Sequence, residues 1–326
     1  MKIMRYLGKS VAAVAAAFAL TVSITSCSES GGTGEAQNGS DGQLRIAVNN
    51  TQASLPVVVA DEEGYFEEQG LDAKVTTVTD ISKIPPTLGK QYDIGFGVQP
   101  SLIQAAAKGI DIAAVSGNAT SSKEQQDYVI MARPEAGINN PSDFSGKKVG
   151  SPTLNGNIHT ATKYWLKKND VNPSSITEMQ VPTPTMVDQL EAGLIDAAEM
   201  QQPFIEQAEK AGMVKVGYAL SAVADPTSMS CWIADRTWAT ENGETLSKYR
   251  AALDDANEWI RDNDADARKV LSEFTGQSLE TIGDAPLTDF NTQIDVESVK
   301  QWDAPMKAVT DFKADLDYSK LVVAGK

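Results

Sequence analysis

A seventeen-residue segment occurs twice in this chain, 103 residues apart. The first copy, DIGFGVQPSLIQAAAKG, begins at Asp93, and the second, DAAEMQQPFIEQAEKAG, begins at Asp196. Six positions carry the same residue in both copies, among them a Gln-Pro pair and a closing glycine. Average composition gives roughly one identity over this length by chance. The repeat therefore predicts two similar lobes within one chain.

The residues around each copy alternate between strand and helix patterns in the same order. In the first half, strands are expected at 44–49, 73–79, 91–97 and 111–117, and helices at 55–66 and 101–109. In the second half, strands are expected at 147–152, 177–183 and 213–219, and helices at 158–168 and 203–211. Strands that alternate with helices are typical of parallel β–α–β units. The sequence predicts an α/β protein whose two lobes each hold a mainly parallel sheet flanked by helices.

The chain is expected to cross between the lobes twice. Residues 128–137 are interpreted as the outgoing connection and residues 228–235 as the return. The predicted first lobe combines residues 44–130 with 225–326, and the second lobe comprises residues 139–223. Two crossings of this kind form a hinge.

The N-terminal residues have the pattern of an export signal. Lys2, Arg5 and Lys9 precede an apolar run that ends in ITSC, with Cys27 as the cysteine. Small residues before this cysteine resemble a bacterial lipobox, so residues 1–26 are interpreted as a lipoprotein signal peptide; an ordinary signal peptide is the alternative. The Gly/Ser-rich residues 27–43 are expected to form a flexible tether. The mature protein is expected to face outside the cytoplasm, attached to the membrane only through its lipid.

Composition excludes several functions. Without the three basic residues of the signal segment, the 28 basic and 44 acidic residues leave a net charge of −19, which does not suit nucleic acid or an anionic membrane surface. His159 is the single histidine, and Cys231 has no partner once Cys27 is lipidated, so His/Cys metal clusters are excluded. The chain contains no G-x-S-x-G, Walker A or G-x-G-x-x-G motif. We expect no enzyme, no cofactor and no metal site.

The repeated Gln-Pro pair predicts two helix starts. Proline is tolerated at the first helical position because its missing N–H would be unpaired there. That places Gln99 and Gln202 at the N-cap positions, where Asn, Asp, Ser or Thr is preferred. Either the two glutamine amides serve a ligand at the strand ends, or they tie loops together; both interpretations stay open.

Four segments resemble one known family. ADEEGYFEEQGLDAKV, DIGFGVQPSLIQAAAKGIDIAAVS, DFSGKKVGSP and LEAGLIDAAEMQQP are similar, in order and spacing, to substrate-binding proteins of ABC importers for sulfonates, taurine, nitrate and thiamine-pyrimidine precursors. The resemblance spans residues 44–275. It implies a periplasmic-binding-protein-like fold of the second topological class, whose lobes close on a ligand. It also implies an ABC permease and ATPase as partners, and we expect a monomer.

The family's cleft, carried onto this chain, implies five ligand-binding loops at strand ends. Their residues are Asn50, Thr51 and Gln52; Gly97 and Gln99; Gly117 and Asn118; Asn155, Gly156, Asn157, His159 and Thr160; and Glu199, Met200, Gln201 and Gln202. Asn157 is expected to cap the helix that follows, and His159 to be a neutral hydrogen-bond donor because the helix dipole disfavours imidazolium.

The ligand is expected to be a small polar nutrient, anionic or zwitterionic, such as a sulfonate. Helix N-termini can hold an anion without a cationic side chain. Glu199 would repel a pure sulfonate or nitrate, and it suits taurine or an aminopyrimidine better. The alternatives are a nitrate or thiamine-pyrimidine-precursor binding protein, a sensor lipoprotein, and an enzyme related to thiamine-pyrimidine synthase, whose cysteine-rich motif this chain lacks.

Overall fold

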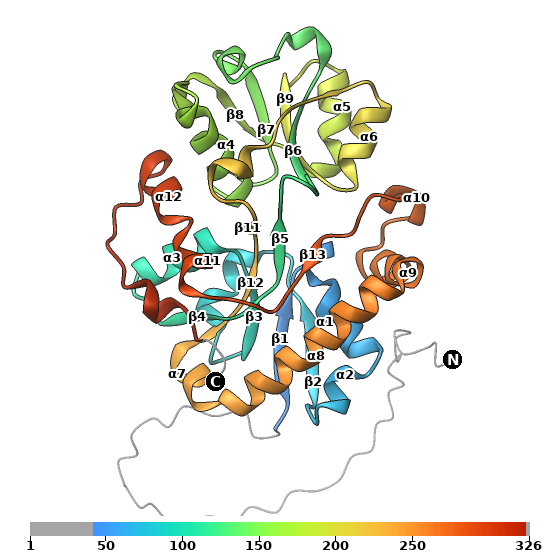
Figure 1. Cartoon of the computed structure of the whole chain (residues 1–326), viewed down its shortest axis with the longest axis vertical. Coiled ribbons are helices and arrows are strands. Elements are labelled where there is room, and N and C mark those ends of the chain that lie inside the picture. Colours follow the sequence, from blue (N-terminus) through green and yellow to red (C-terminus); the bar gives the residue numbers. More distant parts are fainter. Residues whose placement is uncertain (1–41, 324–326) are drawn as a thin grey trace, which may run out of the picture. The chain divides into compact units, whose positions relative to one another are not determined.

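The computed structural model describes residues 42–323, which contain two five-stranded sheets and a small three-stranded sheet (Figure 1). The strands are β1 Leu44–Val48, β2 Ala73–Thr77, β3 Ile94–Gly97, β4 Ile112–Gly117, β5 Ala119–Ser121, β6 Tyr128–Ala132, β7 Lys148–Ser151, β8 Thr177–Gln180, β9 Ala197–Gln201, β10 Val214–Gly217, β11 Thr227–Ser228, β12 Cys231–Asp235 and β13 Asp289–Phe290. The predicted signal peptide and the lipidation site at Cys27 lie outside the described residues.

Helices flank both large sheets. They are α1 Leu55–Glu62, α2 Tyr65–Glu68, α3 Gln99–Ala107, α4 Asn157–Lys168, α5 Met186–Glu191, α6 Phe204–Lys210, α7 Arg236–Glu241, α8 Gly243–Asp262, α9 Asp264–Thr275, α10 Leu279–Ile282, α11 Val296–Lys300 and α12 Asp303–Val309. Within residues 42–323, no helix combines the length and the apolar character needed to cross a bilayer.

The two large sheets have the same strand order. The first sheet runs β2-β1-β3-β12-β4, and the second runs β8-β7-β9-β6-β10. In the first sheet β12 is antiparallel to β3 and β4, and in the second β6 is antiparallel to β9 and β10. The strand pairs β1–β2, β1–β3, β7–β8 and β7–β9 are parallel. The predicted α/β fold with two lobes of mainly parallel sheet is confirmed, and we call the parts built on these sheets the first and second lobes.

Several repeated residues hold equivalent backbone positions in the two lobes. The carboxylate of Asp93 accepts the backbone N–H of Arg45 at 2.8 Å, and that of Asp196 accepts the backbone N–H of Lys148 at 2.9 Å. Each aspartate thus ties the start of one strand, β3 or β9, to the neighbouring strand, β1 or β7. The repeated glycines Gly109 and Gly212, which follow α3 and α6, both have φ of 82°, a left-handed conformation that glycine adopts without strain.

Helices cover both faces of the second sheet. On one face, Met200 of β9 lies in a buried cluster with Leu190 of α5 and Ile205 of α6. On the other face, Ala161 and Leu166 of α4 belong to the main core, which continues into the first lobe. Because strand side chains alternate between faces, neighbours of Met200 on β9 point toward α4.

The lobes are joined through the three-stranded sheet β11-β5-β13, where β5 pairs antiparallel with both neighbours. The predicted outgoing crossing at 128–137 is wrong in position, since β6 is already a full member of the second sheet and the chain crosses at β5. The chain returns to the first lobe at β11. Most of the predicted return segment, 228–235, is strand β12, which already belongs to the first sheet. Alternating patterns identify strands, but they do not specify which sheet a strand joins.

Candidate functional site

A cleft of about 420 Å³ lies where the ends of strands from both lobes meet. The first lobe contributes residues 49–53 after β1, together with Phe96 and Val98 around the end of β3. The second lobe contributes loop residues before and at the start of α4, and the residues that end β9. Asp127, Met229 and Ser230, beside the crossing strands, close the space between them. In open α/β sheets such strand-end crevices are the usual ligand sites.

Seven of the predicted site residues line this cleft. They are Asn50, Thr51, Gln52, Gly156, Asn157, Gln201 and Gln202. They come from three of the five predicted loops, and the structure brings these three loops together. Their contact with a ligand stays a prediction.

The other nine predicted site residues do not line the cleft. They are Gly97, Gln99, Gly117, Asn118, Asn155, His159, Thr160, Glu199 and Met200. Gln99 is fully buried and donates through its amide to the Ser228 hydroxyl at 2.6 Å. Asn118 donates to the Ala53 carbonyl at 2.8 Å. Both side chains thus connect loops of the protein to each other. For Gln99 this was the alternative to a contact with the ligand.

Three predicted helix caps are displaced by one residue. Helix α3 begins at Gln99 with Val98 as its N-cap, and α6 begins at Phe204 after Pro203. The expected glutamine caps are wrong. In α3 proline takes the second helical position, where its missing N–H would have no partner within the helix, and in α6 Pro203 is itself the N-cap. In α4 the cap is Gly156, and the side chain of Asn157 instead donates to the Met229 carbonyl at 3.1 Å.

His159 belongs to a buried charge network behind the cleft wall. Its Nδ1 lies 3.0 Å from Oε1 of Glu199, and its Nε2 lies 3.3 Å from Oε2 of Glu178 without the alignment of a hydrogen bond. Glu178 also pairs with Lys163 at 2.6 Å. His159 and Glu199 are both fully buried, between α4 and β9. Burial lowers the pKa of His159, but the hydrogen bond and charge of Glu199 and the charge of Glu178 outweigh it, so the pKa is raised. The pKa shift is therefore opposite in direction to the one expected from the helix dipole.

Asp127 lines the cleft and escaped the sequence analysis. It precedes β6, is 5% exposed, and accepts a short hydrogen bond from the Ser121 hydroxyl through Oδ1. Its Oδ2 is buried and makes no hydrogen bond of standard geometry among the described residues, although the Thr288 side chain lies close enough to lower its pKa. Burial raises the pKa of Asp127 to about 6; hydrogen bonding from Ser121, from the backbone and from Thr288 lowers it, and the charge of Asp289 raises it further. The sequence shows that Asp127 is a polar residue directly before a strand. It does not show that this strand belongs to the second sheet, which is what places Asp127 at the cleft.

The charge of the cleft wall is unusual for an anion site. Among the described residues that line it, Asp127 is the one carboxylate, and none is lysine, arginine or histidine. Arg45 and Arg133 are committed to Asp93 and Asp196, at 2.6 and 2.5 Å. The arrangement can therefore offer a ligand hydrogen-bond acceptors, amides and hydroxyls, with a negative local charge.

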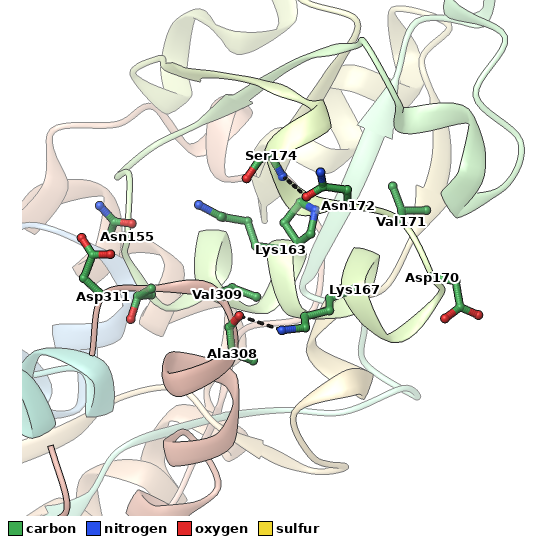
Figure 2. Close-up of a pocket in the computed structure, with 12 residues that line it drawn as sticks. Asn155, Lys163, Lys167, Asp170, Val171, Asn172, Ser174, Ala308, Val309 and Asp311 are labelled. Carbon is green, nitrogen blue, oxygen red and sulfur yellow. Dashed lines mark hydrogen bonds between the residues drawn. The ribbon is translucent and has the colours of Figure 1, made fainter. Parts of the chain in front are cut away.

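A second hollow, of about 600 Å³, lies between α4 and the end of α12 (Figure 2). Asn155, predicted to face the cleft, lines this hollow instead. Lys163 is paired with Glu178, and Lys167 donates to the Ala308 carbonyl at 3.0 Å, as the dashed line in Figure 2 shows. This hollow is wide open and lies at no strand end, so the smaller cleft is the better candidate site.

Two five-stranded α/β lobes with a cleft at their strand ends define a periplasmic-binding-protein fold. Residues 51–267 match the model of the family described as NMT1/THI5 like, and the chain belongs to this family.

Solved structures share the fold at low sequence identity. The periplasmic aliphatic sulphonate binding protein SsuA from Escherichia coli superposes with a TM-score of 0.68 at 19% identity, covering 82% of this chain and 91% of that one. The periplasmic nitrate-binding protein NrtA from Synechocystis PCC 6803 gives 0.66 at 12% identity, with 83% and 84% covered. At such identities the likeness establishes the fold alone.

Two curated relatives differ in activity. A 4-amino-5-hydroxymethyl-2-methylpyrimidine phosphate synthase, THI11 of Saccharomyces cerevisiae, is 22% identical over 70% of this chain and 69% of its own length. A putative binding protein of Brucella abortus (strain 2308) is 25% identical over 66% of both chains. The matched region thus spans about two thirds of these relatives.

Proposed function

We propose that this protein is the substrate-binding component of an ABC importer and that its two lobes close on a small polar nutrient. The observation that carries the proposal is the cleft of about 420 Å³, lined by strand ends of both lobes beside a narrow three-stranded connection. Membership of the family, and the fold shared with sulphonate- and nitrate-binding proteins, support it. The proposed partners are the permease and ATPase of the importer, with the protein acting as a monomer.

A binding role is favoured over an enzymatic one. The cleft wall has no cysteine, lysine or histidine among the described residues, and His159 is buried behind it. The Ser230 hydroxyl accepts hydrogen bonds from the Asn118 amide at 3.0 Å and from the backbone N–H of Ala119 at 3.3 Å. The relation to the yeast synthase makes catalysis the second candidate, which the cleft chemistry does not favour.

The proposed attachment to the membrane is through lipid on Cys27, with the folded part outside the cytoplasm. The ITSC sequence and the Gly/Ser-rich residues that follow it support this proposal. Wild-type protein is expected in the membrane fraction, and Cys27→Ala in the soluble fraction. Wild-type protein found soluble, with a mature N-terminus other than residue 27, would contradict it.

Ligand capture is tested by two measurements on the full chain. A thermal-shift screen of sulfonates, taurine, nitrate and pyrimidines is expected to show a binder, because a ligand that binds only the folded state raises the melting temperature. Small-angle scattering at saturation with that binder is expected to show a smaller radius of gyration. A tight binder that leaves the radius unchanged would argue against closure of the lobes.

A further inference from the structure

We propose that the ligand presents a positively charged nitrogen, an ammonium or amidinium group, to Asp127 and Gln202 on the second-lobe side of the cleft. This inference rests on the proposed binding function and specifies the class of ligand.

Two neighbouring hydrogen-bond acceptors in the cleft wall lack a donor. Asp127 Oδ2 and Gln202 Oε1 are both buried and unpartnered among the described residues, and both residues line the cleft. The two residues lie opposite each other at the end of the β6–β9 pair, because the backbone N–H of Gln202 donates to the carbonyl of Asp127 at 3.0 Å, and opposed residues direct their side chains to the same face. Buried acceptors in folded proteins are almost always satisfied. A group with at least two N–H donors would satisfy both acceptors at once.

The local charge calls for a cation. Asp127 is held as a buried carboxyl, and Asp289 on β13 adds a second negative charge nearby. No basic side chain lines the cleft within residues 42–323 to neutralise them. A buried carboxylate is stable when paired with an opposite charge, and here that charge is left for the ligand to supply.

An anion without an N–H donor is a poor fit to this wall. A sulfonate or nitrate would bring further acceptors toward Asp127 and leave both unpaired oxygens unsatisfied. A zwitterion avoids this conflict, because its acidic end can lie toward the start of α4, where Gly156 and Asn157 line the cleft. The expectation of an anionic or zwitterionic ligand is thereby narrowed to one that carries a cationic nitrogen.

Calorimetry on the full chain with matched pairs of probes tests the inference. The pairs are 2-aminoethanesulfonate against ethanesulfonate, and 4-amino-2-methylpyrimidine against 2-methylpyrimidine, with nitrate as a pure anion. At least one nitrogen-donor probe is expected to bind, and its partner to bind tenfold or more weakly, the size of a hydrogen bond to a charged group.

Asp127→Asn keeps the shape of the side chain and removes its charge, so it is expected to weaken the preferred probe tenfold or more. Asp289→Asn is the matched control: it removes a neighbouring charge that does not line the cleft, so affinity is expected to fall clearly less than in Asp127→Asn. Circular dichroism checks that both variants fold. If an anion binds as tightly as its amino counterpart and Asp127→Asn leaves affinity unchanged, the inference fails while the binding function stands. If no probe binds, the proposed function fails with it.

Discussion

Asp127→Asn is expected to stabilise the protein without ligand at neutral pH. Burial raises the pKa of Asp127 from 3.8 to about 6. The ionisable groups that face it are Asp289 of β13 and the hydroxyls of Tyr128 and Tyr218, both of which also have raised pKa values. A carboxyl whose pKa is raised by folding favours the folded state when protonated. The native state therefore loses stability as the pH rises from the unfolded value through about 6.

The magnitude follows from the size of the shift. About two pKa units at 1.36 kcal/mol each give about 3 kcal/mol of destabilisation at pH 7.5. At pH 4.5 the folded carboxyl is protonated and only about 1 kcal/mol remains. The asparagine keeps an acceptor for Ser121 but places an N–H₂ group at the Oδ2 position, which costs about 1 kcal/mol. The net gain is thus about 2 kcal/mol at pH 7.5, or roughly 5 °C in melting temperature for a chain of this size.

Urea denaturation of wild type, Asp127→Asn and Asp289→Asn at pH 7.5 and 4.5 measures these differences. Because all other carboxyls titrate alike in each protein, their contributions cancel in the comparison. The stability difference for Asp127→Asn is expected to shrink or vanish at pH 4.5, and Asp289→Asn is expected to gain less at either pH. A variant no more stable than wild type at pH 7.5, or a difference independent of pH, would refute the reasoning.

Three further predictions concern the scaffold. Because the pKa of His159 is raised, its ion pairs stabilise the fold below pH 6.5, and this contribution is lost as the pH rises through the raised value. His159→Gln should remove this part of the pH dependence of stability, and an unchanged dependence would contradict the charged pair. Gly117→Ala places a methyl group against a backbone carbonyl oxygen and should cost about 1–3 kcal/mol in thermal denaturation, whereas Gly243→Ala, with open space around it, should be neutral. Asp93→Asn and Asp196→Asn each weaken an equivalent strand anchor, so both should lower stability by about 1–3 kcal/mol, and a loss in one lobe alone would argue against equivalence.

Much of the fold was predictable because it depends on local patterns and on the repeat. Strand and helix periodicities located most of the elements around the two copies of the repeat, although not helix α5, and the 103-residue offset identified their equivalence. Sheet membership was not predictable in the same way. Strand β6 follows the first half in sequence and pairs with β9 of the second sheet, a long-range choice that the alternation of its residues does not encode.

The site was only partly predictable, because a loop position does not determine where a side chain points. Glu199 and Gln201 lie at the end of one strand, yet Glu199 is buried against His159 and Gln201 lines the cleft. The packing of α4 on β9 brings Glu199 and His159 together from 40 residues apart. The same packing explains why the polar residues of a predicted ligand loop instead form an internal charge network.

The two lobes differ at the positions where their repeat reaches the cleft. Gln99 and Gln202 occupy the same position in the two copies of the repeat, 103 residues apart. Asp127 and Ser230 are also 103 residues apart, and each directly precedes the antiparallel strand of its sheet, β6 or β12. In the first lobe, Gln99 does not line the cleft: its amide donates to Ser228 and its Oε1 is buried without a hydrogen-bond partner among the described residues. Ser230 lines the cleft, and its hydroxyl accepts from Asn118 at 3.0 Å. In the second lobe, Gln202 and Asp127 line the cleft and each keeps an unpaired acceptor. The duplicated segment thus provides a common scaffold for both sheets. The lobes differ because a carboxylate, Asp127, stands where the first lobe has Ser230, and because Gln202 lines the cleft and Gln99 does not. Both differences support the proposal that the second lobe recognises the ligand's donor group.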